Sequence, residues 1–586
     1  MHLNYNLFSL ILFTFFSFHF SHSQTWEWVT PAEGLKSDKG TTIVVDAQGN
    51  SYITGYYNEE AQFGPFVTGF SHPNSKEVYV AKIDPNGNYL WMKRGDNYYD
   101  DRGLGLCLDP MGYIYITGTC WGGLTFGSLN VYNSTAYTDQ IYVIKLDNNG
   151  NEIWMKNAGV DSGGSPYNDD HGQDLVADSS GNVYVTGFLS NNRSIPLNAT
   201  FDALNIPMLP HDSLAFLAKL DNSGNWQWVK TFPGIYGYRD NALGIDDEQN
   251  VYVTGGFVGT KIFETTTLTS KGKEDIYVIK YAPNGNFQFI LQAGDSLKDR
   301  GDNIVYGNDG HMYVTGEFRN KVAFGNDTIN NNGSPGGKDI FVAKMTKSGQ
   351  WVWASKAGSN KGQDRGIGIT ANKKGNIFVT GQFSGNAKFG SIDLDGNGDS
   401  VQIFVAAIDT LGKWRWAIQA GSPHFDRGAD IDCDTNCNLY ITGYYNETMV
   451  MGSLTTTAIS GHDIFTAKIN DACFGYDSPV DPNPDPTVSI DTSSGFIFTE
   501  ANVFSPNDDQ VNDLLYLVKN FKGTGEVLII NRWGNAVYQT NDVNLPWNGK
   551  DQRGSSVVDG TYFYTLNLVF INGTVMKRQG FITVVR

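Results

Sequence analysis

Acidic residues in three repeated or clustered patterns are the candidates for chemistry in this 586-residue chain. The first pattern is the tripeptide Asp-Arg-Gly, which pairs a carboxylate with a guanidinium and suits either a polar ligand or a structural ion pair. A residue that recurs in most repeats favours the structural reading, since a ligand site would use residues found in one repeat only. The tripeptide or its variant begins at Asp38, Asp101, Asp170, Asp299, Asp364 and Asp426.

Two further acidic segments have the oxygen ligands that Ca²⁺ prefers. The segment "DLDGNGD" places such oxygens at alternate positions around a glycine, although Phe404 replaces the glutamate that ends an EF-hand loop. The segment Pro506–Asp513 is the second, with a hydrogen-bonded turn as its alternative interpretation. Calcium is therefore the one cofactor that the sequence suggests. Its first candidate ligands are Asp393, Asp395, Asn397 and Asp399.

No motif of a known catalytic mechanism is present. The chain lacks a zinc-protease helix motif, a nucleophile elbow and a phosphate-binding glycine loop, and its nine histidines are not at metal-ligand spacing. Recurring tryptophans follow an Asp-Gly turn, but the Asp-to-Gly interval differs from that of quinone-dependent dehydrogenases and of the sialidase Asp-box. These tryptophans are better explained as packing between repeats. No catalytic residue is assigned, while carboxylates that converge in space for glycoside cleavage remain an alternative.

Composition points to many short strands and argues against nucleic acid. Sixty-seven glycines and 13% aromatic residues fit strands joined by tight turns. A net charge of -19 is the wrong sign for binding phosphates. Five cysteines leave at least one unpaired; Cys433 with Cys437 and Cys107 with Cys120 are the two candidate disulfides.

Seven repeats organise most of the chain. Each contains an aromatic-x-Thr-Gly element, an alternating strand such as "FVAKMT" and Asp-Gly turns, so each is read as four strands. In the sixth repeat these are Gly366–Thr370, Asn376–Gly381, Ile403–Asp409 and Lys413–Ile418. Four antiparallel strands repeated seven times predict an all-β, seven-bladed β-propeller. The elements begin at Tyr52, Tyr115, Tyr184, Tyr252, Tyr313, Phe378 and Tyr440, at intervals of 61 to 69 residues.

The last repeat lacks a fourth strand, and the N-terminal segment has a strand without a repeat. The seventh repeat stops after "FTAKIND", whereas Trp26–Val29 has the sequence of a fourth strand. We predict that Trp26–Val29 pairs with Phe465–Asn470, which closes the ring and removes an exposed sheet edge.

The motifs "D..GN.Y.TG" and "DIFVAK.D..GN..W" resemble the SBBP repeat, a β-propeller repeat of secreted bacterial proteins. The resemblance covers residues 24–470. It implies the fold and says little about activity.

Two segments lie outside the repeats. Residues 1–23 are expected to be a signal peptide, because Leu7–Phe20 is apolar and Ser21–Ser23 supplies small residues for cleavage before Gln24. No later apolar stretch is long enough for a transmembrane helix. Residues 471–496 are expected to be a linker, since Asp477–Ser489 alternates proline with acidic and small residues.

Residues 497–586 have short alternating strands, which predict a small Ig-like β-sandwich. This stretch resembles the gliding motility-associated C-terminal domain of Bacteroidota, the type B sorting domain of the type IX secretion system. It departs from that family at Asp508 and Gln510, where glycine is usual, and at Asn548, where aspartate is usual. The matching residues are Pro506, Asn507, Asp509, Asn512, Asp513, Arg532, Trp533, Gly534, Trp547, Gly549, Asp559, Gly560, Tyr562, Gly580 and Arg586.

The resemblance implies export through the periplasm to the cell surface or the medium, with the type IX secretion machinery as partner. We expect a non-catalytic module that binds a glycan or a surface protein. The alternative is a polysaccharide hydrolase or lyase with its site at the channel mouth. Asymmetric carboxylates with Arg or His at that mouth would favour the enzyme, and a uniform polar ring would favour binding.

Overall fold

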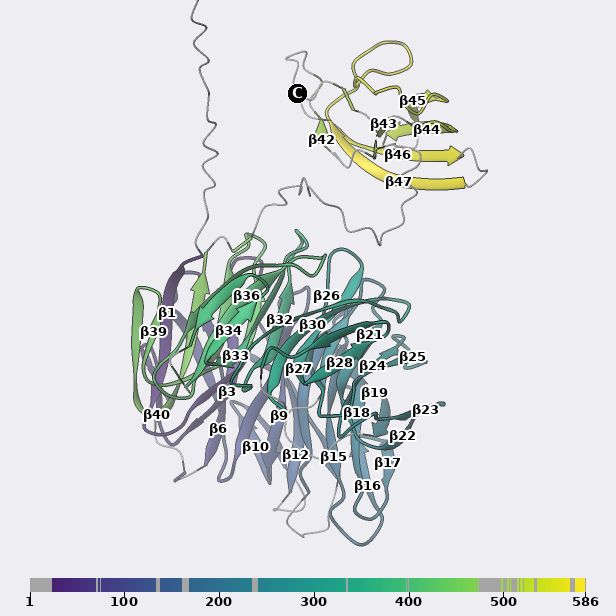
Figure 1. Cartoon of the computed structure of the whole chain (residues 1–586). Coiled ribbons are helices and arrows are strands. Elements are labelled where there is room, and N and C mark those ends of the chain that lie inside the picture. The colour runs from purple at the N-terminus through teal and green to yellow at the C-terminus, as the bar shows by residue number, and fades with distance from the viewer. Residues whose placement is uncertain are drawn as a thin grey trace, which may run out of the picture. The chain divides into compact units, whose positions relative to one another are not determined.

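The computed structural model describes two compact units, Met1–Gly475 and Tyr476–Arg586 (Figure 1). The predicted signal peptide and most of the predicted linker lie outside the described residues. The described residues are 24–69, 72–73, 75–132, 138–160, 168–233, 241–333, 336–396, 398, 400–470, 472–473, 497–498, 503–504, 506, 514–515, 517–519, 521–531, 535–569 and 575–584.

Seven groups of four antiparallel strands form the first unit, and we number them groups 1 to 7 in the order given below. Within each group the strands are adjacent in the sheet, from the first to the fourth. The groups are β2 (Lys39–Val45), β3 (Ser51–Asn58), β6 (Lys76–Ile83), β7 (Tyr89–Asp96); β8 (Asp101–Leu108), β9 (Ile114–Trp121), β12 (Asp139–Leu146), β13 (Glu152–Val160); β14 (His171–Ala177), β15 (Val183–Ser190), β18 (Ser213–Leu220), β19 (Trp226–Pro233); β20 (Ala242–Ile245), β21 (Val251–Phe257), β24 (Asp275–Tyr281), β25 (Phe287–Ala293); β26 (Arg300–Tyr306), β27 (His311–Arg319), β30 (Lys338–Thr346), β31 (Trp351–Ser359); β32 (Arg365–Ala371), β33 (Ile377–Ser384), β36 (Val401–Ile408), β37 (Trp414–Ala420); and β38 (Arg427–Cys433), β39 (Leu439–Met451), β40 (Leu454–Ile469), β1 (Trp26–Gly34).

Asp-Gly turns connect the strands as the sequence predicts. In the turn between β2 and β3, Asp46 Oδ1 accepts hydrogen bonds from the backbone N–H groups of Gln48 (3.0 Å) and Asn50 (2.9 Å). Gly49 has φ +82°, which a residue with a side chain adopts only at a cost. The aspartate and the glycine therefore set the hairpin geometry locally.

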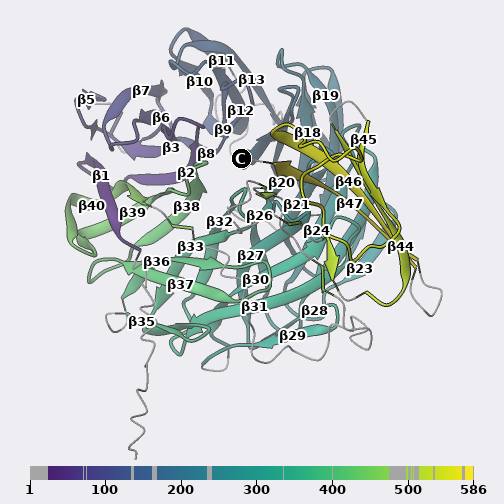
Figure 2. The same ribbon diagram turned by 90° about the horizontal axis from the view of Figure 1, so that it is seen from above.

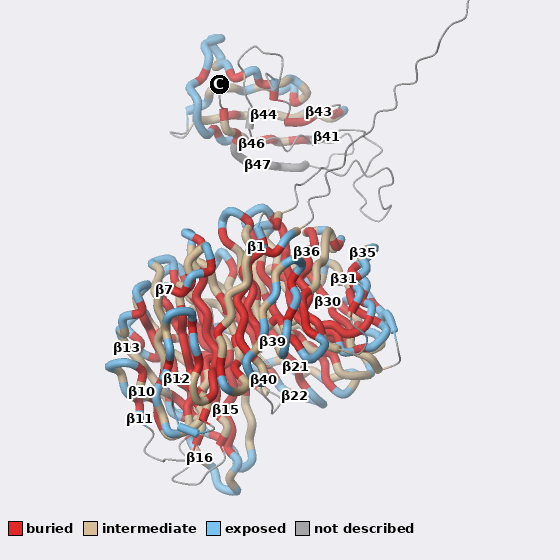
Figure 3. Tube along the Cα trace, turned by 90° about the vertical axis from the view of Figure 1, so that its left-hand side faces the viewer, coloured by how far each residue is buried: buried red, intermediate tan, exposed pale blue. Residues whose placement is uncertain are grey.

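The groups surround a common centre, as Figure 2 shows from above. Each first strand contacts the first strand of the next group, and β38 contacts β2, so the circle is complete. The second and third strands of groups 1 to 6 are largely buried, as in β3 and β6, and red marks such buried stretches in Figure 3. Hydrophobic clusters join neighbouring groups; one contains Ile43 and Ile53 of group 1 with Tyr440 and Ile464 of group 7. The core thus lies between the sheets.

The N-terminal strand β1 is the fourth strand of group 7. It pairs antiparallel with β40, in a register that places Trp28 opposite Lys468 and Ala32 opposite Ile464. Trp26 is 8% exposed. The predicted pairing of the N-terminal strand with the last repeat is confirmed, and the edge of β40 is covered.

Six short hairpins between second and third strands were not predicted. Their strands have two to five residues, too short for an alternating pattern to show. Four of them pair with the fourth strand of the preceding group in the ring and extend its sheet to six strands. The hairpins are β4 (Ala61–Phe63) with β5 (Phe66–Val67), β10 (Gly123–Phe126) with β11 (Leu129–Tyr132), β16 (Leu197–Phe201) with β17 (Leu204–Met208), β22 (Thr260–Phe263) with β23 (Thr266–Thr269), β28 (Lys321–Phe324) with β29 (Asp327–Asn330), and β34 (Asn386–Phe389) with β35 (Ile392–Asp395).

The second unit contains a five-stranded sheet in the order β42-β47-β46-β44-β45 and a two-stranded sheet, β41-β43. Trp547, 1% exposed, lies in its hydrophobic cluster. Among the described residues of the whole chain there are strands and no helices, so the all-β class is confirmed. The strands are β41 (Ile497–Phe498), β42 (Val503–Phe504), β43 (Val518–Lys519), β44 (Thr524–Asn531), β45 (Ala536–Thr540), β46 (Gly560–Val569) and β47 (Val575–Val584).

Candidate functional site

The aspartates of the Asp-Arg-Gly tripeptides are buried and bind backbone. Asp364 Oδ1 accepts a hydrogen bond from Ser384 N (2.9 Å) and Oδ2 accepts one from Ser359 N (2.5 Å). Asp170 accepts the corresponding bonds from Val160 N (2.6 Å) and Ser190 N (2.8 Å). Burial raises the pKa of Asp364 to about 6. These carboxylates join the end of the preceding group's fourth strand to the end of the second strand through hydrogen bonds to backbone N–H groups, so the predicted ion pair between repeats is wrong for the aspartates.

The residue that follows the aspartate makes the charged contact between groups. Arg365 Nε lies 2.8 Å from Asp302 Oδ2, and Arg300 Nε lies 2.9 Å from Glu274 Oε1, in each case in the preceding group. In group 1 the cation is Lys39, whose Nζ lies 4.4 Å above the ring centroid of Tyr444 in group 7. The aspartate and the cation that follows it therefore have structural roles in these groups.

The edge of the ring at which the first strands begin is not symmetric. Groups 4 to 6 carry ion pairs there, which join Glu274 to Arg300 and Glu317 to Lys338. Groups 7, 1 and 2 carry aromatic rings there, and groups 1 and 2 also carry ion pairs. These rings are Phe425, Tyr444 and His462 near group 7, and His72, Tyr98, Tyr99 and Trp121 near groups 1 and 2.

Four rings near groups 1 and 2 form a continuous row, which we call the aromatic track: His72, Tyr98, Tyr99 and Trp121. Consecutive ring centroids are 4.5, 5.2 and 5.2 Å apart, and the last pair is stacked at 28°. The side chain of Tyr98 is 65% exposed, and His72 is exposed. Sequence reasoning missed this site. Its signal was "NYYDDRG", where two tyrosines precede the tripeptide in one repeat only.

Asn97 fixes the loop that carries the two tyrosines. Its Nδ2 donates hydrogen bonds to the carbonyl oxygens of Trp121 (2.7 Å) and Gly123 (2.6 Å), and its Oδ1 accepts one from Tyr98 N (2.7 Å). The loop between β7 and β8 is thereby joined to the end of β9. The track is therefore organised by the fold before any ligand arrives.

An ionic cluster borders the aromatic track. Asp100 Oδ2 lies 2.5 Å from Lys76 Nζ and 3.1 Å from Arg102 Nη2. Burial alone would raise the pKa of Asp100, but its bonds to Lys76 and the charge of Arg102 outweigh burial and hold that pKa below its usual range. The three side chains are between 22% and 28% exposed. They offer donors and acceptors beside the rings.

A cavity of about 130 Å³ lies at the centre, lined by residues from all seven groups. It contains three carboxylates, Asp174, Asp302 and Asp430, which equivalent positions of other groups lack. Asp174 Oδ2 accepts a hydrogen bond from Leu243 N (2.8 Å), and Asp430 Oδ2 accepts one from Ile43 N (3.1 Å), each in the next group. The cavity is smaller than the 300 Å³ or more typical of ligand pockets.

Burial raises the pKa of Asp174 to about 6 and that of Asp430 well above its usual value. Sequence reasoning missed both residues, because neither belongs to a recurrent motif. Carboxylates that are not repeated in every group, as expected of an enzyme, are thus present. However, one oxygen of Asp174 and one oxygen of Asp430 already accept a hydrogen bond from a backbone N–H group.

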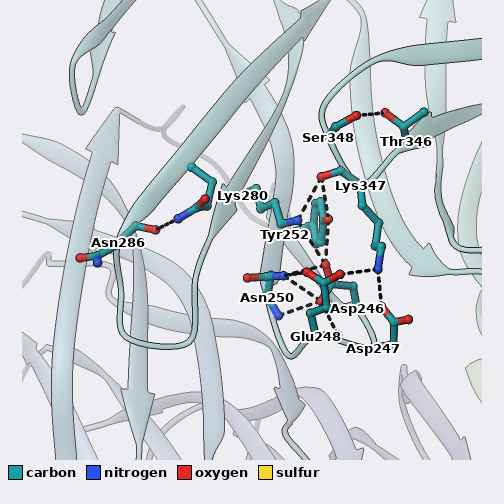
Figure 4. A network of polar contacts seen from close by, with 11 residues as sticks. Asp246, Asp247, Glu248, Asn250, Tyr252, Lys280, Asn286, Thr346, Lys347 and Ser348 are labelled. Atoms are coloured by element: carbon teal, nitrogen blue, oxygen red, sulfur yellow. Dashed lines mark hydrogen bonds and ion pairs between the residues drawn. The ribbon is translucent and has the colours of Figure 1, made fainter.

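A third arrangement recurs where the Asp-Gly turns lie, and Figure 4 shows it in group 4. Asp246 Oδ2 lies 3.0 Å from Tyr252 Oη and 3.3 Å from Lys280 Nζ. Lys280 Nζ also donates a hydrogen bond to the backbone oxygen of Lys347 (3.0 Å), in the turn of group 5. In group 5, Trp353 Nε1 donates to the carbonyl of the next group's turn (3.0 Å). The predicted packing of tryptophans between repeats is confirmed.

Two of the four candidate calcium ligands, Asp393 and Asp395, lie in β35. Asp393 is exposed and lies 2.6 Å from Lys388 Nζ across the hairpin, and Asp395 is exposed on the same side. Asn397 and Asp399 are outside the described residues. In the part of the chain that the structure describes, no three acidic, histidine or cysteine residues gather as metal ligands. Calcium here stays a prediction.

The sorting-motif residues that the structure describes form the core and turns of the second unit. Trp547 and Tyr562 pack edge to face at 5.6 Å, and Tyr562 Oη donates to Val558 O (2.7 Å). Gly549 and Gly560 have φ +69° and +145°, Gly580 lies in β47, Pro506 is half-buried and Asp559 is exposed. Outside the described residues lie Asn507, Asp509, Asn512, Asp513, Arg532, Trp533, Gly534 and Arg586.

The disulfide joins Cys437 to Cys473, and neither candidate pair forms. Cys107 lies opposite Tyr115 in the β8–β9 ladder, whereas Cys120 lies opposite Asp101 at the other end. Cys433 lies opposite Leu439, at the end of the ladder and before the turn that holds Cys437. Strand register thus separates both candidate pairs. A search of the described residues for a helix long and apolar enough to span a bilayer finds none.

A relative of known sequence aligns with most of the chain at low identity. A WD repeat-containing protein, L264, of Acanthamoeba polyphaga mimivirus is 21% identical over 514 residues, which cover 72% of this chain and 36% of the viral protein. The chain thus spans about a third of that relative's length.

The solved structures that are similar to this chain include the polysaccharide lyase Uly1. The two are 10% identical with a TM-score of 0.36, and the alignment covers 74% of this chain and 90% of the lyase. A point mutant of NanB sialidase from Streptococcus pneumoniae has 8% identity, a TM-score of 0.34, and coverage of 72% and 90%. PorZ, an essential surface component of the type IX secretion system of Porphyromonas gingivalis, has 9% identity, a TM-score of 0.23, and coverage of 95% and 100%.

Residues 498–584 match the family described as CHU_C Type IX secretion signal domain. This match implies that the protein is exported by the type IX secretion system to the cell surface or the extracellular space.

Proposed function

We propose that the protein is a non-catalytic binding module that acts outside the cell. The observation that carries this proposal is the aromatic track, a row of rings that breaks the symmetry of the ring at one place and leaves Tyr98 65% exposed. The repeated aspartates, in contrast, are buried and bind backbone. Exposed, organised aromatic residues are typical of binding sites.

The proposal includes the finer architecture. Groups 1 to 7 are the blades of a seven-bladed β-propeller of SBBP-type repeats over residues 24–470, closed by β1. Residues 1–23 are a signal peptide, 471–496 a linker, and 497–586 an Ig-like type B sorting domain as found in Bacteroidota. The circle of first-strand contacts and the β1–β40 ladder support the propeller.

The ligand is a glycan or a surface protein. The net charge of -19 opposes nucleic acid. Whether the exported protein stays attached to the surface or is released does not alter this proposal.

A second candidate function is a polysaccharide hydrolase or lyase. The observation that favours it is the presence in one cavity of Asp174 and Asp430, two buried carboxyls with raised pKa values, because active sites often hold such groups. Against it stand the volume of about 130 Å³ and the backbone bonds of both carboxylates.

A glycan array and a reducing-end assay on the same purified mature chain separate the two functions. We expect binding to at least one glycan or surface protein and no release of reducing ends from the bound glycans. Release of reducing ends or of unsaturated products that Asp174→Asn abolishes, while the melting midpoint is retained, would instead establish the enzyme.

A further inference from the structure

We infer that the aromatic track binds a neutral polysaccharide chain by packing sugar rings on its exposed members, His72 and Tyr98, which Tyr99 and Trp121 support. This inference rests on the proposed function and names its ligand class. The C–H groups on one face of a pyranose ring carry partial positive charge, and an aromatic face carries partial negative charge. The exposed rings His72 and Tyr98 lie 4.5 Å apart at 49° and offer neighbouring contacts to an extended chain. Tyr99 lies edge to face with Tyr98 at 77° and stacks on Trp121 at 28°, so these two half-buried rings support the exposed pair.

The rim of the track supplies the polar part of such a site. Asp100, Lys76 and Arg102 are bonded to one another and remain about a quarter exposed. Hydroxyl groups of a sugar exchange hydrogen bonds with such groups while water stays close. A protein partner that covered the track would have to desolvate this ionic cluster, which is costly. The rim therefore favours a hydrated, hydroxyl-rich ligand.

Charge favours a neutral chain over an anionic one. The protein carries a net charge of -19, and the rim combines two cations with one carboxylate that both cations contact. The negative net charge would repel a polyuronate or a sulfated chain at long range. At the rim, the carboxylate already offsets part of the positive charge of the two cations.

The track is also held in place before binding. Asn97 joins its loop to the carbonyls of Trp121 and Gly123, so little ordering is required when a ligand stacks. Tyr98, which is 65% exposed, is the natural anchor.

Affinity electrophoresis of the mature full chain in gels with hydroxyethyl cellulose, galactomannan or laminarin tests the inference. Polygalacturonate is the anionic counterpart. At least one neutral polymer should retard the wild type, and Tyr98→Ala should weaken that retardation about tenfold, the effect expected from one lost stacking contact. Tyr98→Phe should stay within about twofold of wild type, since it keeps the aromatic face.

Tyr132→Ala is the matched control, because Tyr132 is 79% exposed on β11 and lies outside the track. It should bind as wild type does. Trp121→Ala should behave as Tyr98→Ala, and its melting midpoint reports whether it still folds. Three results would overturn the inference: no retardation by any neutral polymer, retardation by polygalacturonate alone, or equal binding by wild type and Tyr98→Ala.

These outcomes are distinct from failure of the proposed function. If Tyr98→Ala binds as tightly as wild type, the track is not the site but the protein still binds glycan. If reducing ends are released while Tyr98→Ala loses binding, the track stands and the non-catalytic function is wrong.

Discussion

Cys437 and Cys473 form a disulfide, with Cα atoms 5.5 Å apart, that ties the segment after β40 to the turn between β38 and β39. Ala472 N adds a hydrogen bond to Cys437 O (2.9 Å). In other groups a turn at this place leads from the third strand to the fourth, but in group 7 the fourth strand is β1, from the other end of the chain. The disulfide therefore fixes a strand end that has no hairpin.

The neighbouring group also lacks its usual polar contacts there. Group 6 has Asn372, Phe378 and Ala407 where groups 1 to 3 and group 7 have the aspartate, tyrosine and lysine seen in group 4. Trp416 Nε1 of group 6 donates to Ala472 O (3.0 Å), and Asn372 Nδ2 lies 2.7 Å from Cys473 Sγ. The disulfide thus positions Ala472 O and Cys473 Sγ. The contact between groups 6 and 7 at this place depends on these two atoms.

Replacing Cys473 by serine should lower the free energy of unfolding by about 2–4 kcal/mol, because the open loop gains conformational entropy. Guanidinium unfolding of the oxidised protein measures this. Cys433→Ser, which alters a cysteine outside the disulfide, is the control and should cost less. Equal midpoints for wild type and Cys473→Ser would show that the bond adds no stability.

Removing residues 24–30 should destabilise the first unit by several kcal/mol, since group 7 loses its β1 ladder and a tryptophan site empties. Trp26→Ala alone should cost about 3–5 kcal/mol, because that side chain is 8% exposed. Urea unfolding followed by circular dichroism is the measurement. Leu35→Ala, at a residue 53% exposed just after β1, should change little. An unchanged midpoint after the deletion would contradict the role of β1.

Stability should fall as pH rises from about 4 to about 8. Burial raises the pKa of Asp38 to about 8, of Asp299 to about 7 and of Asp426 to about 6, from 3.8. In this window the folded state holds more protons than the unfolded state, so unfolding becomes easier as pH rises. His171, whose pKa burial lowers to about 4, and His462, whose pKa burial also lowers, act in the opposite direction but are two groups against several.

Urea unfolding at several pH values checks this, with Asp364→Asn as the matched variant. The stability difference between wild type and Asp364→Asn should be larger at pH 4.5 than at pH 8, because the pKa of Asp364 is about 6. The change in that difference should not exceed about 3 kcal/mol. Wild-type stability that rises between pH 5 and pH 8 would refute the expectation.

Deleting residues 497–586 should leave a folded first unit that accumulates in the periplasm. The signal domain matches residues 498–584, and export information is expected to go with it. Fractionation of a host that has a type IX system, with immunoblots of the full and truncated chains, is the test. Equal amounts of both at the surface or in the medium would place the export signal elsewhere.

Much of the fold was predictable because its signals are local. Alternating side chains and Asp-Gly turns such as that of Asp46 set each strand and hairpin within a few residues. The short hairpins escaped prediction because strands such as β4 have too few residues to show a period. Of the candidate site, the recurrence of the Asp-Arg-Gly tripeptide was visible, but not that Asp364 would bind backbone while Arg365 reached the preceding group.

By itself, the sequence determined the repeat, the number of its copies, the missing strand of the last copy and the resemblance of the C-terminal segment to a secretion domain. Each of these features depends on residues that are close together in the sequence or on a simple periodicity. Only the tertiary structure decided which distant residues meet: Cys437 with Cys473, Asp174 with the backbone of Leu243, and Tyr99 with Trp121. Strand register and the closure of the circle bring these partners together, and no local pattern of residue types encodes such a meeting.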